Sequence, residues 1–217
     1  MTITVIGDNT GNDFAGTEDT HLHSGNATTN YGTGVLMEAT KYNASNHIHT
    51  CLSFSGLSNI AGPVTVNTAT LSLYMSDSSG TGHVVSLYRL LRNWVEAQAT
   101  WNIFSTANNW QTAGGLGAND RSGTLSTSAT VNTPNGYKSW TGTQLNTDTA
   151  DFINGTVSNY GWHLERTDGA NDLGWRVFRP SDHTDTQRPY LTVDHSPAAS
   201  GQGRLLSNRR NRSVLCI

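Results

Sequence analysis

The stretch His47-Ile-His-Thr-Cys-Leu-Ser-Phe54 alternates between two kinds of residue from end to end. Successive side chains of a β-strand point to opposite faces of the sheet, so the alternation predicts a strand with one buried face. The residues expected on the buried face are Ile48, Thr50, Leu52 and Phe54, and those expected on the other face are His47, His49, Cys51 and Ser53. Such a strand needs partners that bury the same face.

Similar patterns recur along most of the chain. Strands are predicted over residues 68–75, 84–90, 161–166, 174–178 and 189–193, with polar turns between them. Residues 143–154 have helical periodicity, and Gly155 would end that helix. Residues 102–134 hold few apolar side chains and predict long loops with at most a short ribbon. The expected fold is all-β: an antiparallel β-sandwich or jelly roll with long loops and one short helix.

The composition agrees with this architecture. Charged residues make up 13% of the chain, whereas Ser, Thr, Asn and Gly together provide 94 of its 217 residues. Long exposed helices need Glu, Lys, Arg, Gln and Ala on their outer faces, so this composition disfavours them and favours short strands joined by polar turns. Six Trp, seven Tyr and five Phe supply enough apolar surface to exclude a fully disordered chain.

The charges are distributed unevenly. Four of the 13 Lys and Arg residues follow Ser200 and no acidic residue does, so the body carries a net charge of −7 and the tail +4. A body this acidic is not attracted to a phosphate backbone, so we predict no nucleic-acid partner. No run approaches the roughly 18 apolar residues of a membrane span, and the start lacks the regions of a signal peptide. We therefore expect neither a membrane partner nor a signal sequence.

Several short motifs follow one another in a defined order. They are Asp19-Thr-His-Leu22 with Asn30-Tyr-Gly32, Leu52-Ser-Phe54 with Gly56-Leu57, Trp94-Val-Glu96 with Thr100-Trp-Asn102, Asn159-Tyr-Gly161, Phe178 with Ser181, and Arg188-Pro-Tyr-Leu191. With this set, residues 19–194 resemble the DNRLRE-domain proteins, which are related to disaggregatase modules and to carbohydrate-binding modules. The resemblance implies a non-catalytic β-sandwich that binds acidic polysaccharide or serves as a surface module. Family members also occur in phage structural proteins.

The chain is expected to have three parts. Residues 1–13 form an N-terminal arm, residues 14–196 the sandwich domain, and residues 197–217 a basic tail. Arginines without acidic neighbours complement an acidic surface, and apolar residues near both ends of the tail would anchor it. The predicted docking residues are Arg204, Leu205, Leu206, Arg209, Arg210, Arg212, Val214, Leu215 and Ile217.

Aromatic side chains are the first candidates for a glycan site, because sugar rings stack on aromatic rings. Trp94 and Trp101, which belong to the resembling motifs, are expected in the core with Phe54, Leu71 and Leu73. Trp110 stands in a polar loop and is the candidate for an exposed platform. The cations available to support glycan binding are Arg89, Arg92 and Lys138.

The sequence offers two kinds of candidate metal site. His21-x-His23 and His47-x-His49 each place two imidazoles on one strand face and could bind Zn²⁺ if the pairs converged, but we interpret them as outward-facing polar residues. A structural Ca²⁺ ion held by Asp19 and Asp194 is the alternative, since oxygen ligands alone suffice for calcium. No other cofactor is expected.

The function we predict is that of a non-catalytic structural protein on a virion surface, such as a phage capsid decoration protein. Its partners would be capsid or other virion proteins, further copies of itself and surface glycans. The sequence has no Gly-x-Ser-x-Gly elbow, and its acid and base residues lie in solvated turns, so we expect no enzymatic activity. A stand-alone carbohydrate-binding module is the first alternative, and a fragment of a polysaccharide-active enzyme is the second.

Overall fold

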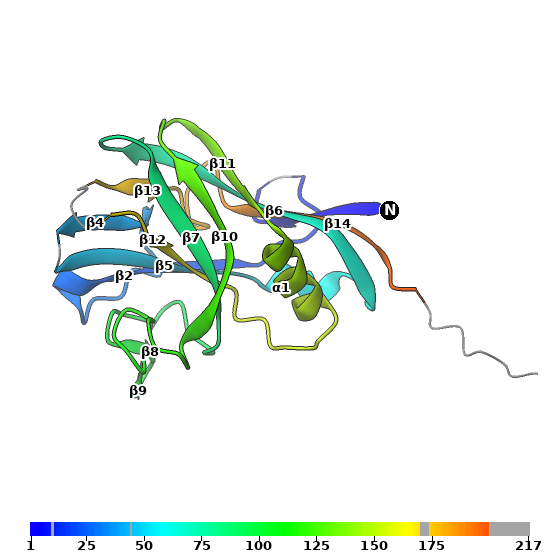
Figure 1. The fold of residues 1–217 in the computed structure, drawn as a ribbon, viewed down its shortest axis with the longest axis horizontal. Helices are drawn as coiled ribbons and strands as arrows, with labels where there is room; N and C mark the ends of the chain where they lie inside the picture. Colours follow the sequence, from blue (N-terminus) through cyan, green and yellow to red (C-terminus); the bar gives the residue numbers. More distant parts are fainter. Residues whose placement is uncertain (10, 44, 170–173, 200–217) are drawn as a thin grey trace, which may run out of the picture.

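Alternating strands form two antiparallel sheets that pack face to face (Figure 1). The computed structural model describes residues 1–9, 11–43, 45–169 and 174–199. Sheet A contains β1 (Thr2–Gly7), β14 (Tyr190–Pro197), β6 (Val64–Ser78), β13 (Arg176–Phe178), β3 (Met37–Glu38) and β11 (Gly136–Thr141). Sheet B contains β10 (Arg121–Val131), β7 (His83–Leu90), β12 (Trp162–Arg166), β5 (Asn46–Phe54), β2 (Thr17–His23) and β4 (Thr40–Asn43). The predicted all-β sandwich is confirmed.

The main core fills the space between the two sheets. Alternate residues of β5 and β6 face inward, and Leu52, Phe54, Leu71 and Leu73 are fully or almost fully buried there. Trp162 on β12 lies in the same core, in edge contact with Phe152 at 5.2 Å between ring centroids. The inward positions of β5 are the ones that its alternation predicts.

The predicted helix is also present. α1 (Thr143–Ile153) buries Leu145 and Phe152 and contacts both β6 of sheet A and β10 of sheet B. It therefore covers one end of the sandwich, as Figure 1 shows. Gly155 follows it with a φ of 67°, a conformation that glycine adopts without a steric penalty. No helix among the described residues is long and apolar enough to cross a membrane.

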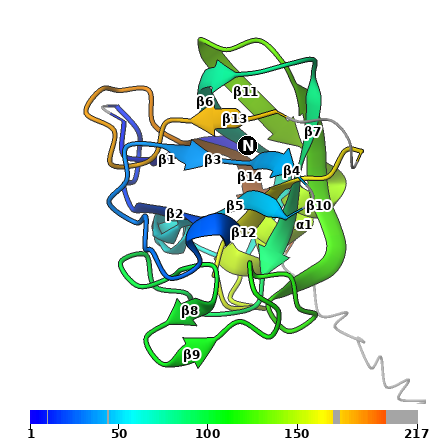
Figure 2. The same ribbon diagram turned by 90° about the vertical axis from the view of Figure 1, so that its left-hand side faces the viewer.

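Residues 91–120, which we call the lobe, pack on the outer face of sheet B. The backbone N–H of Leu91 donates to the Asp120 carbonyl at 2.8 Å and closes the base of the lobe. The lobe carries the short ribbon of β8 (Ile103–Ser105) and β9 (Asn108–Asn109), which Figure 2 shows beside the strands of sheet B. A second apolar cluster joins it to the sheet, and its buried members are Leu22, Cys51, Leu90, Trp94, Ala99 and Trp110.

Two short 3-10 helices, η1 (Ser24–Asn26) and η2 (Ser55–Asn59), follow β2 and β5. Strands β3 and β4 are nearly continuous in sequence, yet β3 pairs with β13 in sheet A and β4 pairs with β5 in sheet B. Residues 37–43 therefore pass from one sheet to the other, at the edge where η1 and β2 end. This crossing shapes the site described below.

Two sequence predictions need correction. The expected N-terminal arm contributes β1, which pairs with β14 from Thr2 opposite His195 to Gly7 opposite Tyr190, so residues 2–7 belong to the sandwich. Residues 121–131, expected to be loop, form β10 beside β7. Their Ser, Thr and Gly content and two register shifts hide the alternation of this strand.

Candidate functional site

Trp110 is not an exposed glycan platform. Only 4% of it is exposed, and its indole N–H donates to the Thr100 carbonyl at 2.9 Å. The polar residues around it face solvent, while its ring points into the cluster beneath the lobe, where Phe104 lies 5.5 Å away. The prediction that Trp110 is exposed, which was based on its polar neighbours in the sequence, is therefore wrong. Trp94 is buried as expected, whereas Trp101 is only half-buried.

The cations proposed to accompany Trp110 do not form one surface with it. Arg89 lies 3.6 Å from the Asp148 carboxylate, and Arg92 lies 3.5 Å from Asp120 and over the Phe104 ring. Lys138 is on β11 in the other sheet. Each of the two arginines already faces a carboxylate, so neither offers an unpaired charge to an acidic glycan.

The two aspartates predicted to hold calcium lie in different sheets. Asp19 is on β2, where it is 4% exposed and accepts the Ser181 backbone N–H at 2.7 Å. Asp194 is on β14 and accepts an amide N–H of Asn67 at 3.3 Å. Their hydrogen bonds engage separate partners, so the structure provides no shared calcium site for this pair. The docking residues of the tail, residues 204–217, lie outside the described part of the chain.

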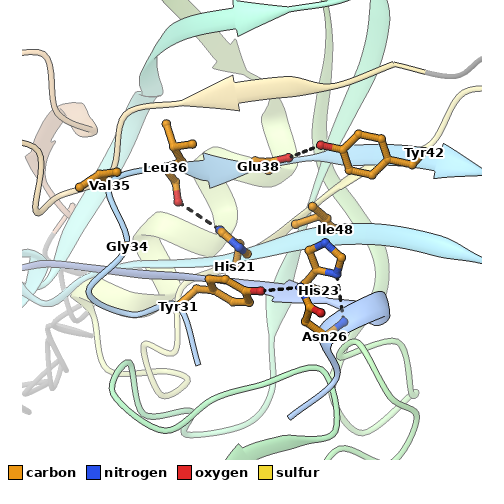
Figure 3. Close-up of a pocket in the computed structure, with 10 residues that line it drawn as sticks. All are labelled: His21, His23, Asn26, Tyr31, Gly34, Val35, Leu36, Glu38, Tyr42 and Ile48. Carbon is orange, nitrogen blue, oxygen red and sulfur yellow. Dashed lines mark hydrogen bonds between the residues drawn. The ribbon is translucent and has the colours of Figure 1, made fainter. Parts of the chain in front are cut away.

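A groove opens instead where residues 37–43 cross between the sheets (Figure 3). We call it the Tyr31 groove, and it has a volume of about 340 Å³. Its walls are formed by His21, His23, Asn26, Tyr31, Gly34, Val35, Leu36, Glu38, Tyr42 and Ile48. Several apolar groups on its rim are open to solvent: Val35 is 66% exposed, Leu36 43% and Tyr42 37%. The groove thus combines exposed apolar groups with a few polar ones.

The motif Asn30-Tyr-Gly32 positions the central ring of this groove. The Asn30 side-chain amide donates to the backbone carbonyls of Glu96 and Ala99, both at 2.7 Å, and ties the motif to the lobe. A side chain at position 32 would collide with the Glu96 backbone, so only glycine allows this approach. Held in this way, Tyr31 stacks on His21 with 4.0 Å between ring centroids.

Hydrogen bonds fix the polar groups of the groove. Asn26 donates to the Tyr31 hydroxyl at 3.0 Å, and His21 Nδ1 lies 3.1 Å from the Leu36 carbonyl. The Tyr42 hydroxyl donates to the Glu38 carboxylate at 3.4 Å across the opposite wall, as Figure 3 shows. Because His21 covers one face of the Tyr31 ring, a ligand ring can stack only on the other.

The groove carries little positive charge at neutral pH. Burial lowers the pKa of His21 to about 4 and also lowers the pKa of His23, so both imidazoles are neutral at pH 7. Burial raises the pKa of Glu38, and hydrogen bonds from Thr40 and Tyr42 partly oppose the shift. None of the residues that line the groove is Lys or Arg. Glu38 is therefore the main source of charge.

An exposed tryptophan extends the aromatic surface beyond Glu38. Val177 on β13 pairs with Glu38 on one side and with Asp77 of β6 on the other. Trp175 is two residues before Val177, is 36% exposed, and donates its indole N–H to Asp77 at 3.0 Å. Burial is the main reason that the pKa values of Glu38 and Tyr42 are raised, and the nearby Asp77 carboxylate raises both further.

The sequence contained partial signals for these residues. Tyr31 belongs to one of the resembling motifs, and the His21-x-His23 spacing singled out the two histidines as possible metal ligands. The two histidine pairs do not converge, however. Among the described residues, the only set of three potential ligands with atoms within 4.8 Å of one another is His49, His163 and Glu165, which lies beneath the lobe.

The chain matches the model of a protein family over most of its length. The model of carbohydrate-binding module family 96 matches residues 11–195, which include both sheets, the lobe and the Tyr31 groove. No curated protein matches the chain. The match bears out the carbohydrate-binding part of the resemblance described above, while the DNRLRE assignment and the phage origin stay predictions.

Proposed function

Since the chain belongs to carbohydrate-binding module family 96, we propose that it binds a carbohydrate in the Tyr31 groove and on the adjoining Trp175 surface. The observation that carries the proposal is the solvent-open groove lined by Tyr31 and Tyr42, with the exposed Trp175 two residues before Val177, which pairs with Glu38 of the groove. Aromatic faces complement the C–H faces of sugar rings, and the amide, imidazole and carboxylate groups beside them complement sugar hydroxyls. Within the described residues, the site lies at the edge where the two sheets are bridged.

The charge of the site favours a neutral glycan over an acidic one. The carboxylates of Glu38 and Asp77 face this surface, and the imidazoles of His21 and His23 are neutral at pH 7. A uronic-acid polymer would bring further negative charge close to Glu38 without a lysine or arginine of the groove to offset it. We therefore propose a neutral, hydroxyl-rich polysaccharide as the ligand class, in place of the acidic polysaccharide that the resemblance implies.

The test is affinity electrophoresis and titration calorimetry of the full chain with neutral and acidic polysaccharides. We expect binding to at least one neutral polymer, and Tyr42→Ala should weaken it about 3–10-fold because a stacking contact is lost. Tyr137→Ala is the matched control, since Tyr137 is equally exposed at 37% but lies on β11, outside the groove. Absence of binding to every polymer, or equal losses in both variants, would contradict the proposal.

Catalysis, attachment to a virion and self-association are separate questions from carbohydrate binding. The proposal needs no catalytic group, in keeping with the prediction that the protein is not an enzyme. Docking through the tail was predicted for residues 204–217, which lie outside the described residues. This docking, the virion role and self-association all stay predictions. Their test is the protein composition of purified particles from the source of the chain.

A further inference from the structure

Three potential metal ligands meet on the outer face of sheet B. His163 and Glu165 are alternate residues of β12, and His163 pairs with Cys51 of β5, two residues from His49. Alternate residues of paired strands share a face, so the register brings His49, His163 and Glu165 together. One donor atom from each residue lies within 4.8 Å of the other two.

The backbone carbonyl of Gly114 orients both imidazoles. His49 Nδ1 lies 3.2 Å from this oxygen, and His163 Nε2 lies 2.9 Å from it. A carbonyl only accepts, so each ring donates through that nitrogen and keeps a lone pair on its other nitrogen. Histidines that bind metals commonly donate their second ring N–H to a carbonyl or carboxylate in this way.

The remaining nitrogen of His163 has no partner among the described atoms. His163 is fully buried, and its Nδ1 is a buried atom without a hydrogen bond. An unpaired buried polar atom destabilises the folded state, so a site that keeps one calls for an explanation. Burial lowers the pKa of both His49 and His163, and both rings are therefore in the neutral form that binds metals.

The spacing of the donor atoms suits a small divalent cation. His49 Nε2 lies 4.0 Å from Glu165 Oε2. Two atoms bound to one zinc ion at about 2.0–2.2 Å in tetrahedral geometry are separated by roughly 3.3–3.6 Å, so a small rotation of either side chain closes the gap. Glu165 can accept the cation through Oε2, because Arg121 contacts the other oxygen, Oε1, at 2.9 Å.

Both positively and negatively charged side chains lie around the cluster. Arg121 forms an ion pair with Glu165 and acts electrostatically on both histidines. Its positive charge therefore disfavours the binding of another cation nearby. A cavity of about 350 Å³ gives access to His49 and Glu165 and is lined by Lys41, His47, His49, Trp101, Leu116, Glu165, Arg166 and Thr167. Cys51 is opposite His163, but burial raises its pKa, so its thiol stays protonated.

We propose that His49, His163 and Glu165 bind one divalent transition-metal ion, in the first instance Zn²⁺, with a remaining coordination position open to the cavity beside Trp101. Two imidazoles and one carboxylate form a donor set typical of zinc and unsuited to calcium, which prefers oxygen ligands. Because both rings are held by Gly114, the ion fastens the lobe to sheet B. This site is separate from the Tyr31 groove and does not depend on carbohydrate binding.

The test uses the full chain with Cys216→Ser, so that this cysteine cannot bind the metal. After dialysis against a chelator, the protein is titrated with ZnCl₂ by calorimetry and with CoCl₂ by visible absorption. We expect one ion per chain, a raised melting temperature, and the intense absorption of four- or five-coordinate Co²⁺. Absence of zinc binding in this chain would overturn the proposal.

The variants locate the ion. Glu165→Gln and His163→Gln should each weaken zinc binding by more than about tenfold. His195→Gln on β14 is the matched control and should leave it unchanged. Arg121→Gln should tighten binding, because a competing positive charge is removed. Since His163→Gln can also destabilise the fold, circular dichroism accompanies each titration, and the nearly isosteric Glu165→Gln decides. Unchanged zinc affinity in folded Glu165→Gln protein would place the ion elsewhere and refute the site.

Discussion

The chain contains two histidine pairs with the same spacing, His21-x-His23 and His47-x-His49, on the adjacent strands β2 and β5. In the antiparallel register His21 is opposite Thr50, and His49 is opposite Leu22. The two pairs therefore face opposite sides of sheet B. His21 and His23 line the open Tyr31 groove, whereas His49 lies beneath the lobe and is only 5% exposed. The spacing of residues determines which of them share a face of the strand. The pairing register and the segments packed on that face determine whether it is open to solvent or buried.

The space between the two sheets and the space beneath the lobe are filled by different kinds of side chain. The space between the sheets is filled by aliphatic and aromatic side chains, and Trp162 is fully buried there. The space beneath the lobe combines the apolar cluster with histidines, charged side chains and backbone carbonyls. We therefore expect packing to contribute more to stability between the sheets, and polar contacts to contribute more beneath the lobe.

The largest effect is expected from a tryptophan of the inner face. Trp162→Ala leaves a large cavity in the main core and should lower the free energy of unfolding by about 3–5 kcal/mol. Trp101→Ala, in the half-buried position over His49, should cost about 0.5–3 kcal/mol. Denaturant titration of both variants checks the order. An equal or larger loss in Trp101→Ala would show that the lobe, rather than the space between the sheets, dominates the stability.

Acidification should lower the free energy of unfolding through the buried histidines of both regions. The pKa of His21 is lowered to about 4 and that of His49 to about 3, against about 6.5 in the unfolded chain. Between these values the unfolded state binds protons that the folded state does not, so stability is complete above pH 6.5 and falls as the pH falls. Each ring should account for up to about 3 kcal/mol between pH 6.5 and 4.5.

The measurement is the free energy of unfolding as a function of pH for the wild type, His21→Gln and His49→Gln. Each substitution should make the loss on acidification smaller. If zinc occupies the site beneath the lobe, His49→Gln should also lose the metal-dependent stabilisation at pH 7, whereas His21→Gln should keep it. Identical pH dependence in all three proteins would mean that neither ring is buried in its neutral form.

A carboxyl pair at the other end of β2 should have the opposite pH dependence. Burial raises the pKa of Asp19 to about 6 and that of Glu96 to about 7, and Glu96 accepts the Asp19 backbone N–H at 2.8 Å. Here the folded state binds the extra protons, so the stability contributed by each group is complete below about pH 4 and is lost as the pH rises to 6–7. Asp19→Asn should remove about 3 kcal/mol of this loss. A pH profile unchanged in Asp19→Asn would contradict the shift.

Much of the fold could be predicted because its strands have one strongly apolar face. β5, β6, β7, β12 and β14 follow from alternation, and α1 follows from its periodicity and from Gly155. The sequence predicts no strand over residues 121–131, because Ser, Thr and Gly dominate them and because the register shifts twice along β10. β1 was missed because an edge strand at the end of the chain carries a weak pattern.

The sites could be predicted only in part. Trp110 was assigned from its polar neighbours, yet a loop of polar residues can direct one aromatic side chain into a second core. Tyr31 belonged to a recognised motif, but its stacking on His21 depends on contacts of Asn30 with the lobe, more than sixty residues away. The cluster of His49 and His163 requires the pairing of β5 with β12 and the position of Gly114, which no local pattern contains.

The smallest effect expected concerns the charge of the open groove. Glu38→Gln keeps the size of the side chain and its contact with Tyr42 but removes the negative charge from the groove wall. Affinity for a neutral glycan should change little, whereas affinity for an acidic glycan should rise by roughly 1.5–5-fold, the size of a partly screened surface charge interaction. The rise should diminish with added salt, because screening weakens interactions between exposed charges. Calorimetric titration at two salt concentrations measures both effects. A large loss of neutral-glycan affinity would instead show that the Glu38 carboxylate binds sugar hydroxyls directly, and the groove would then select its ligand by hydrogen bonding more than by charge.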